Sequence, residues 1–171
     1  ANFIAVASGN YHTMGLRSHG TIGAWGMCDV EQCDVPPPNA GFTAIAAGDS
    51  HSLALRGDGS IAAWGSNESA QLDVPAPNTG YVAMAAGLLH NLALRLNGSI
   101  VGWGSQVVVA PSALTDLVAV AASGSHSLGL KPDGSIVAWG DDAHGECIVP
   151  TPNTGFVAIA AGEFVDAWGS V

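Results

Sequence analysis

The residues best suited to metal chemistry are four histidines that recur at regular intervals along the chain. They are His12, His51, His90 and His126. Zinc requires ligands within about 2.1 Å of one point, so the four imidazoles would have to converge on a common axis. A histidine that recurs beside a small polar residue at the start of an apolar segment is more typical of a hydrogen-bonding residue in a core. We therefore expect a structural role for these histidines, with neither a metal site nor a cofactor.

Catalytic motifs are not evident in the sequence. The segment Asp49-Ser50-His51 contains the residue types of a catalytic triad. Neighbours in one tight turn, however, cannot adopt the geometry of nucleophile, base and orienting acid. The stretch from Asp141 to Glu146 is the densest polar cluster and could bind calcium, but it lacks the alternating acidic spacing of a calcium loop. We expect no catalytic residues.

A Trp-Gly pair marks each of several internal repeats. The tryptophans are Trp25, Trp64, Trp103, Trp139 and Trp168, and their successive spacings are 39, 39, 36 and 29 residues. A regular period of about forty residues is the signature of a repeat architecture. We interpret residues 1–171 as a single repeat domain in which the tryptophans and the repeated histidines are structural. The copies lie approximately at 3–41, 42–80, 81–116 and 117–155, with a truncated copy at 156–171 that lacks the histidine.

Each full copy reads as a set of short antiparallel strands. In the second copy, Phe42 to Ala47 and Ser52 to Arg56 are strand-like, and Ser60 to Trp64 forms a third strand after a glycine turn. A short segment from Gln71 to Pro75 could add an outer strand, because proline is tolerated at a sheet edge. Three or four strands repeated every forty residues is typical of a propeller blade. The predicted fold is all-β: a β-propeller, or partial propeller, of four complete antiparallel blades plus a shortened fifth repeat.

The repeat pattern resembles a known family. Residues 44–65 and 118–140 carry most clearly the pattern Val-Ala-x-Ala-Ala-Gly-x-x-His-Ser-Leu-Ala-Leu-x-x-Asp-Gly-Ser-Ile-x-Ala-Trp-Gly. This pattern resembles the repeat of the regulator-of-chromosome-condensation family. The short repeat length and the linker motif Val-Pro-x-Pro-Asn-Thr-Gly are closer to bacterial members, such as the propeller-type β-lactamase inhibitor protein. The resemblance implies a propeller, but not a function, because the family scaffolds unrelated binding tasks.

The number of copies departs from that family, whose propellers commonly have seven blades. The fifth copy has lost the second strand and its hairpin. An arc of blades that does not close would leave an apolar blade face and an unpaired strand edge at each end. The chain could close as a tight ring of four or five blades, or two chains could complete a ring of about eight. The shortened end and the larger family ring favour a homodimer.

Composition and charge limit the range of partners. The formal charge of −10 and only four Lys and Arg residues argue against nucleic-acid binding. No apolar run reaches the length of a membrane helix, so we expect no membrane partner; the compartment stays open. The cations share one repeat position just before the glycine turn, where we expect them to pair with turn carbonyls or acids. They are Arg17, Arg56, Arg95 and Lys131.

Three cysteines do not form a disulfide framework. Cys33 and Cys147 occupy matching positions where the second copy has Leu72, which is most simply a packing site. Alternatively, Cys28 and Cys33 could form a local disulfide in an oxidising compartment. No four-ligand zinc pattern accompanies these cysteines.

Residues that vary between otherwise similar copies identify a candidate binding face. The strand directions place the Gly-x-x-His turns and the segments after Trp-Gly on one face. The variable candidate residues are Asn10, Tyr11, Asp49, Ser50, Leu88, Leu89, Ser125, Glu163 and Phe164 in the turns, and Asn67, Asp141 and Asp142 after Trp-Gly. Large apolar groups on loops favour a protein-binding patch. We therefore expect a non-enzymatic protein-binding module; the alternatives are self-association and a hydrolase or lyase acting at the channel mouth.

Overall fold

The computed structural model describes residues 2–105 and 114–162, which form twelve β-strands. The strands are β1 (Phe3–Ser8), β2 (His12–Arg17), β3 (Ile22–Gly26), β4 (Phe42–Ala47), β5 (His51–Arg56), β6 (Ile61–Gly65), β7 (Tyr81–Ala86), β8 (His90–Arg95), β9 (Ile100–Gly104), β10 (Ala119–Ser123), β11 (His126–Leu130) and β12 (Ile136–Gly140). Within these two ranges, no helix is long and apolar enough to cross a membrane.

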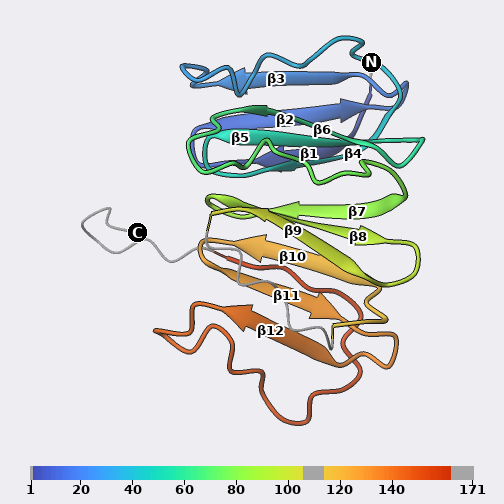
Figure 1. The fold of residues 1–171 in the computed structure, drawn as a ribbon, viewed down its shortest axis with the longest axis vertical. Helices are drawn as coiled ribbons and strands as arrows, with labels where there is room; N and C mark the ends of the chain where they lie inside the picture. The colour runs from blue at the N-terminus through green and yellow to red at the C-terminus, as the bar shows by residue number, and fades with distance from the viewer. Residues whose placement is uncertain (1, 106–113, 163–171) are drawn as a thin grey trace.

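Consecutive strands form four separate three-stranded antiparallel sheets, in the orders β1-β2-β3, β4-β5-β6, β7-β8-β9 and β10-β11-β12. The hairpin between the second and third strands turns at a glycine with positive φ, such as Gly59 at 79°. A Cβ at Gly59 would lie 2.9 Å from the backbone nitrogen of Gly80, so this turn excludes larger residues. The sheets stack face to face as an arc of four blades (Figure 1). The predicted all-β fold with four antiparallel blades is confirmed.

The expected outer strand at Gln71 to Pro75 is wrong. Asp73 N donates to Ala70 O and Val74 N donates to Leu72 O, so this segment folds as successive turns. The carbonyl of Gln71 accepts hydrogen bonds from the side chains of Asn91 and Trp103 in the next blade. Because these backbone groups are already bonded, the segment cannot form a fourth ladder.

The hydrophobic core lies between the blades. One face of each sheet contributes three side chains from its second and third strands, and the next sheet covers them with an aromatic or Leu, a small residue and the repeat tryptophan. Between the first two blades, the two sets are Met14, Leu16 and Ile22 against Phe42, Ala54 and Trp64. Leu53, Leu55 and Ile61 meet Tyr81, Ala93 and Trp103 at the second junction. Leu92 and Leu94, with the partly buried Ile100, meet Leu117 and Trp139 at the third.

The described blades form an open arc, and they do not close into the tight ring that a single chain could have formed. The first and fourth blades lie at opposite ends of the stack (Figure 1). Residues of the first blade that would face a preceding blade are uncovered: Trp25 is 49% exposed, whereas Trp64 and Trp103 are each 6% exposed. The fifth copy begins like the first, inner strand of a blade. Phe156 N donates to Gly134 O, just as Phe42 N at the start of β4 donates to Gly20 O.

Candidate protein-binding face

The Gly-x-x-His turns and the segments after Trp-Gly are joined by hydrogen bonds in every blade. In each blade the first amide after Trp-Gly donates to the carbonyl of the residue before the repeated histidine. The pairs are Met27 to Tyr11, Ser66 to Ser50, Ser105 to Leu89 and Asp141 to Ser125, at 2.9 to 3.0 Å. Because one bond fixes the two variable loops of each blade together, these loops lie on one face of the arc.

The inner ends of these turns converge on a hollow of about 190 Å³. Its lining comes from all four blades and from Ala161 of the fifth copy. Of the candidate residues, Asn10, Asp49 and Leu88 line it, together with Gly124 at the matching position of the fourth blade. The turns that surround it are closely packed, since a Cβ at Gly9 would collide with the carbonyl oxygen of Gly48. A similar backbone frame thus presents one variable residue from each blade.

The other candidates surround the hollow or lie farther out. Tyr11 is 57% exposed, whereas Ser50, Leu88, Leu89 and Ser125 are half-buried. The candidates after Trp-Gly, Asn67, Asp141 and Asp142, are exposed. Glu163 and Phe164 lie outside the described residues. The apolar part of this face is therefore smaller than the sequence implies, with Tyr11 as its most exposed large side chain.

Asp49 is the acidic residue that lines the hollow. One carboxylate oxygen accepts from Asn10 Nδ2 at 2.6 Å, and the other accepts from Ser50 Oγ at 2.7 Å. The bond from Asn10 links the first two blades across the turn. His51, the third residue of the triad-like segment, is fully buried and points away into the blade junction. The three side chains therefore do not form a nucleophile–base pair.

Three of the repeated histidines are hydrogen-bonding residues of the core, and each contacts the neighbouring blade. His12 Nε2 lies 2.8 Å from Ser52 Oγ, His51 Nε2 lies 2.7 Å from Asn91 Oδ1, and His90 Nε2 lies 3.0 Å from Ser127 Oγ. Asn91 Oδ1 can only accept, so His51 carries its proton on Nε2. In the described residues, no three His, Cys, Asp or Glu side chains converge as metal ligands would.

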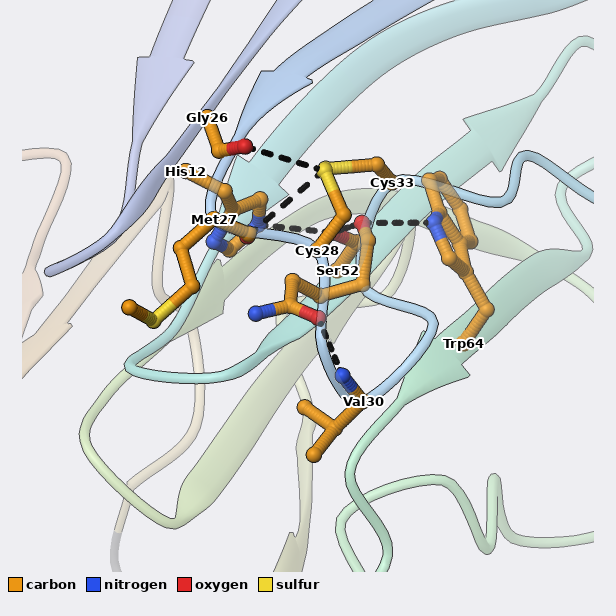
Figure 2. Close-up of a disulfide and its surroundings, with 9 residues drawn as sticks. His12, Gly26, Met27, Cys28, Val30, Cys33, Ser52 and Trp64 are labelled. Carbon is orange, nitrogen blue, oxygen red and sulfur yellow. Dashed lines mark hydrogen bonds between the residues drawn. A yellow bond between two sulfur atoms is a disulfide. The ribbon is translucent and has the colours of Figure 1, made fainter.

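In the first two junctions a loop carbonyl completes the contact. We call the histidine, its polar partner and, where described, this carbonyl the inter-blade latch. In the first latch the carbonyl of Gln32 accepts from Ser52 Oγ at 2.8 Å and from Trp64 Nε1 at 3.0 Å (Figure 2). In the second, the carbonyl of Gln71 accepts from Asn91 Nδ2 and Trp103 Nε1. The latch therefore joins a histidine and a loop of one blade to a polar residue and a tryptophan of the next.

The loop that carries Gln32 is closed by a disulfide between Cys28 and Cys33 (Figure 2). This finding decides between the two sequence alternatives for these cysteines. In the second blade the matching residues are Asn67 and Leu72, and Asn67 Oδ1 accepts from Leu72 N at 2.8 Å. The same loop closure is thus achieved by a covalent bond in one blade and by a side-chain hydrogen bond in another.

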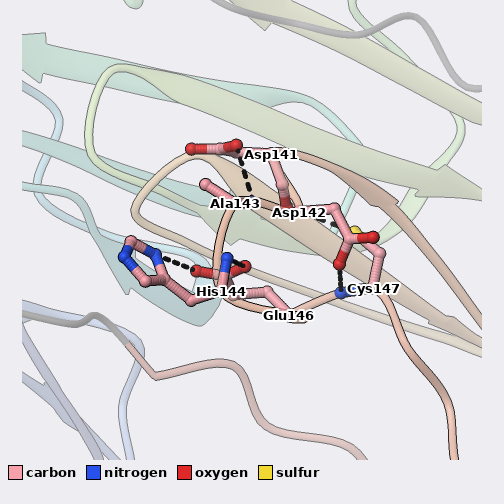
Figure 3. Close-up of polar contacts among 6 residues, drawn as sticks. All are labelled: Asp141, Asp142, Ala143, His144, Glu146 and Cys147. Carbon is pink, nitrogen blue, oxygen red and sulfur yellow. Dashed lines mark hydrogen bonds and ion pairs between the residues drawn. The ribbon is translucent and has the colours of Figure 1, made fainter.

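The acidic cluster of the fourth blade closes its own loop in the same manner (Figure 3). Asp142 Oδ1 accepts from Cys147 N at 2.9 Å, and Glu146 Oε2 accepts from His144 N at 2.9 Å. Asp141 Oδ1 accepts from Ala143 N. These carboxylates are directed at backbone amides, so the calcium site considered from the sequence is not assembled by them. Glu146 occupies the position of Gln32 and Gln71 in the other latch loops.

Burial lowers the pKa of three latch histidines. The pKa of His90 falls to about 4, mainly because burial disfavours the charged ring and secondarily because His51 and His126 lie nearby. Burial likewise lowers the pKa of His12 and His51, against a smaller opposing effect of Asp49. At neutral pH these rings are uncharged and can act as hydrogen-bond donors within the junctions.

The repeated cations stack on aromatic rings, which the sequence reasoning missed. Arg17, Arg56 and Arg95 place their guanidinium carbons 5.0, 4.9 and 5.1 Å from the ring centroids of Phe3, Phe42 and Tyr81. The expected pairing with acids is secondary. The signal was present in the repeats, because the aromatic residue always precedes the arginine by the same interval. In the fourth copy both members change, to Leu117 and Lys131.

The fold and this face define a propeller-type repeat protein, and the comparisons with known proteins identify its repeat. The family profile of the "Regulator of chromosome condensation (RCC1) repeat" matches residues 42–71 and 117–146. The chain therefore has a propeller-type fold and carries RCC1 repeats at residues 42–71 and 117–146. A search of curated proteins gave no significant match.

Solved structures share the fold at low sequence identity. Prp20p from Saccharomyces cerevisiae is 21% identical, with a TM-score of 0.70 over 81% of this chain and 45% of that chain. The ectodomain of the Physcomitrella patens receptor kinase CR4 is 23% identical, with a TM-score of 0.74 over 94% of this chain and 45% of that chain. Human WBSCR16 is 18% identical, with a TM-score of 0.67 over 81% and 47%. The chain thus spans about half the length of these structures.

Proposed function

We propose that the chain is a non-enzymatic protein-binding module that contacts its partner with the Gly-x-x-His face. The observation that carries this proposal is the hollow, where the same turn in the first three blades presents a different side chain. Positions Asn10, Asp49 and Leu88 differ in charge and polarity while the glycine before each of them is kept. A constant frame with variable contact residues is what recognition of a specific surface requires.

Tyr11 is the expected anchor of this contact. Tyrosine is enriched among residues that dominate binding energy, because it buries a large area and still offers a hydroxyl group. It stands 57% exposed beside the hollow. The fold relatives support a protein partner in general terms, since Prp20p is described by its binding to Gsp1p and histones and by a complex with Kap60.

Binding experiments with the intact chain test this face. The wild-type protein, a Tyr11→Ala/Leu88→Ala variant and a Leu96→Ala variant would serve as baits for cross-linking capture and identification of partners. Leu96 is the matched control, because it is 86% exposed on the hairpin between β8 and β9, at the opposite end of the strands. We expect the partner to be lost only with the double variant. Equal capture by all three baits would refute the proposed face.

The second part of the proposal is that two chains complete one ring as a homodimer. Support comes from the uncovered apolar side chains of the first blade, including Phe3 at 48% and Trp25 at 49% exposure. Mass measurement of the intact protein at micromolar concentration tests this part, independently of any other partner. A chain mass of 17.1 kDa would contradict it, and a mass near twice that value would support it.

A further inference from the structure

From the repeated latch we infer where two copies meet: the first blade of one chain docks on the fourth blade of the other, head to tail. This inference rests on the proposed homodimer and names its surfaces. The described blades form three junctions, which show what each blade face packs against. We call the face that packs against the preceding blade the receiving face. The opposite face, which packs against the following blade, is the supplying face.

The open side of the first blade is a complete receiving face. At the internal junctions this face carries an aromatic residue or leucine, a packed aliphatic residue and the repeat tryptophan; in the second blade these are Phe42, Ile45 and Trp64. The corresponding residues of the first blade are Phe3, Val6 and Trp25. They are 48%, 64% and 49% exposed. The same side chains that are covered inside the chain are thus exposed at its first blade.

The polar part of the receiving face is also present, and the Thr13 hydroxyl lies 3.4 Å from Ser8 Oγ of the same blade. Thr13 matches Ser52 and Asn91, the residues that accept from a histidine and donate to a loop carbonyl. Trp25 matches Trp64, whose Nε1 donates to that carbonyl. Within the described part of the chain, the Trp25 indole has no hydrogen-bond partner. A hydrogen-bond acceptor on the partner surface would satisfy it.

The fourth blade carries the complementary supplying face. Leu128, Leu130 and Ile136 occupy the positions of Met14, Leu16 and Ile22 in the first junction. His126 occupies the position of His12, His51 and His90, which contact the next blade, and its imidazole makes no hydrogen bond within the described residues. The loop with Glu146 replaces the loop with Gln32. His126 of one copy would therefore donate to Thr13 of the other, and the carbonyl of Glu146 would accept from Trp25.

The start of the fifth copy covers part of the supplying face and must be displaced when a second copy docks. Phe156 N donates to Gly134 O, which places the segment 156–162 where the inner strand of the docking blade would lie. The segment forms no strand ladder, and Val157 is 93% exposed. A complete three-stranded blade pairs its inner strand in a ladder, which residues 156–162 do not, so it is the better occupant.

Two such junctions close a ring by twofold symmetry. Head-to-tail contacts form rings when their rotation closes, and open filaments when it does not. The chain spans 45% to 47% of the length of the propellers that share its fold. Closure of a ring by two copies accords with the proposed homodimer, and an open filament is the other outcome that the test below distinguishes.

The test uses the intact chain and two variants at 0.15 M salt, where surface repulsion between the acidic chains is largely screened. Val6→Asp places a charge on the receiving face, and Leu128→Asp places one on the supplying face. Val82→Asp is the matched control, because Val82 is also an exposed apolar residue of an inner strand but lies in the third blade. Light scattering should give a dimer for the wild type and Val82→Asp, and monomers for Val6→Asp and Leu128→Asp. Circular dichroism checks that each variant is folded.

Mixing the two monomeric variants identifies the polarity. A mixed pair contains one intact junction, formed by the unaltered fourth blade of Val6→Asp and the unaltered first blade of Leu128→Asp. We expect the mixture to recover dimer, with at least tenfold tighter association than either variant alone. A dimeric Val6→Asp variant, or a mixture that stays monomeric, would overturn the junction while leaving the homodimer itself standing. A monomeric wild type would overturn both, and filaments would overturn ring closure.

Discussion

Asn91 stands in the second latch where the first and third latches have Ser52 and Ser127. Its Oδ1 accepts from His51 and its Nδ2 donates to the carbonyl of Gln71. One amide therefore makes the two bonds that a serine hydroxyl makes in the first latch. Since all three positions are buried, an apolar side chain there would leave a donor without an acceptor.

We therefore expect Asn91→Leu to lower the free energy of unfolding by about 1–3 kcal/mol, the cost of leaving the His51 N–H buried and unbonded. Asn91→Ser is the matched control, because serine makes the same pair of contacts in the first latch. Urea unfolding followed by tryptophan fluorescence measures both variants. If the two variants prove equally stable, the latch bond contributes nothing measurable.

The low pKa of His90 makes stability depend on pH. Above pH 6.5 the ring is neutral in both the folded and unfolded chains, so there is no dependence. Below 6.5 the unfolded chain gains a proton that the folded chain takes up only near pH 4. Stability attributable to His90 is therefore full above pH 6.5 and is lost as the pH falls towards 4.

Unfolding at pH 7.5 and at pH 4.5 should show that loss in the wild type. The shift of His90 from 6.5 to about 4 corresponds to about 3 kcal/mol in total. His90→Gln is the reference, because its amide can still donate to Ser127 but does not titrate. We expect the wild type to lose more stability than the variant over this range, although His12 and His51 titrate in both. Parallel pH profiles would contradict the assignment.

At the scale of elements, the strand pattern could be predicted from the sequence and the loops after the third strands could not. Phe42 to Ala47 was expected as a strand and forms β4 with those bounds. Its aromatic residue, the small apolar residues that follow and its flanking turns are local signals. The segment from Gln71 to Pro75 could have been an outer strand by its sequence. In the structure, side chains of the next blade donate to the carbonyl of Gln71. That contact is between blades and has no local signature.

The candidate face was predictable only in outline. Connectivity alone orders the turns, and the repeats themselves reveal which positions vary. The degree of exposure was not predictable, since Leu88 is half-buried by the neighbouring turn, to whose Gly124 carbonyl its amide donates. The stacking of Arg56 on Phe42 could have been found by comparing columns of the repeat, because the pair is replaced together in the fourth copy.

The latch loops offer a further prediction at this scale. Closing the short loop between Cys28 and Cys33, five residues apart, is worth about 2 kcal/mol by the chain-entropy relation. Cys28→Ser/Cys33→Ser should lose about that amount. Cys28→Asn/Cys33→Leu copies the second blade, where Asn67 bonds to Leu72 N, and should recover part of it. Urea unfolding under oxidising conditions compares the three proteins, and identical losses in both variants would show that the copied hydrogen bond does not form.

At the scale of the whole molecule, stability should be distributed unevenly along the arc. In repeat proteins each unit contacts its neighbours alone, and total stability is roughly a sum of units and junctions. The second and third blades each take part in two junctions, and the first blade takes part in one. Opening an end blade therefore breaks fewer contacts than opening an inner one.

Amide hydrogen exchange of the Val6→Asp variant, in which docking of a second copy is blocked, should reveal this gradient. Amides of β5 and β8 should exchange most slowly and those of β2 faster, because local opening of the first blade costs less free energy than opening of the inner blades. In the wild type at dimer-forming concentration, β2 should approach the protection of β5, since its receiving face is then covered. If β2 and β5 are equally protected in the variant, the blades unfold as one cooperative body and the arc does not behave as a chain of separable junctions.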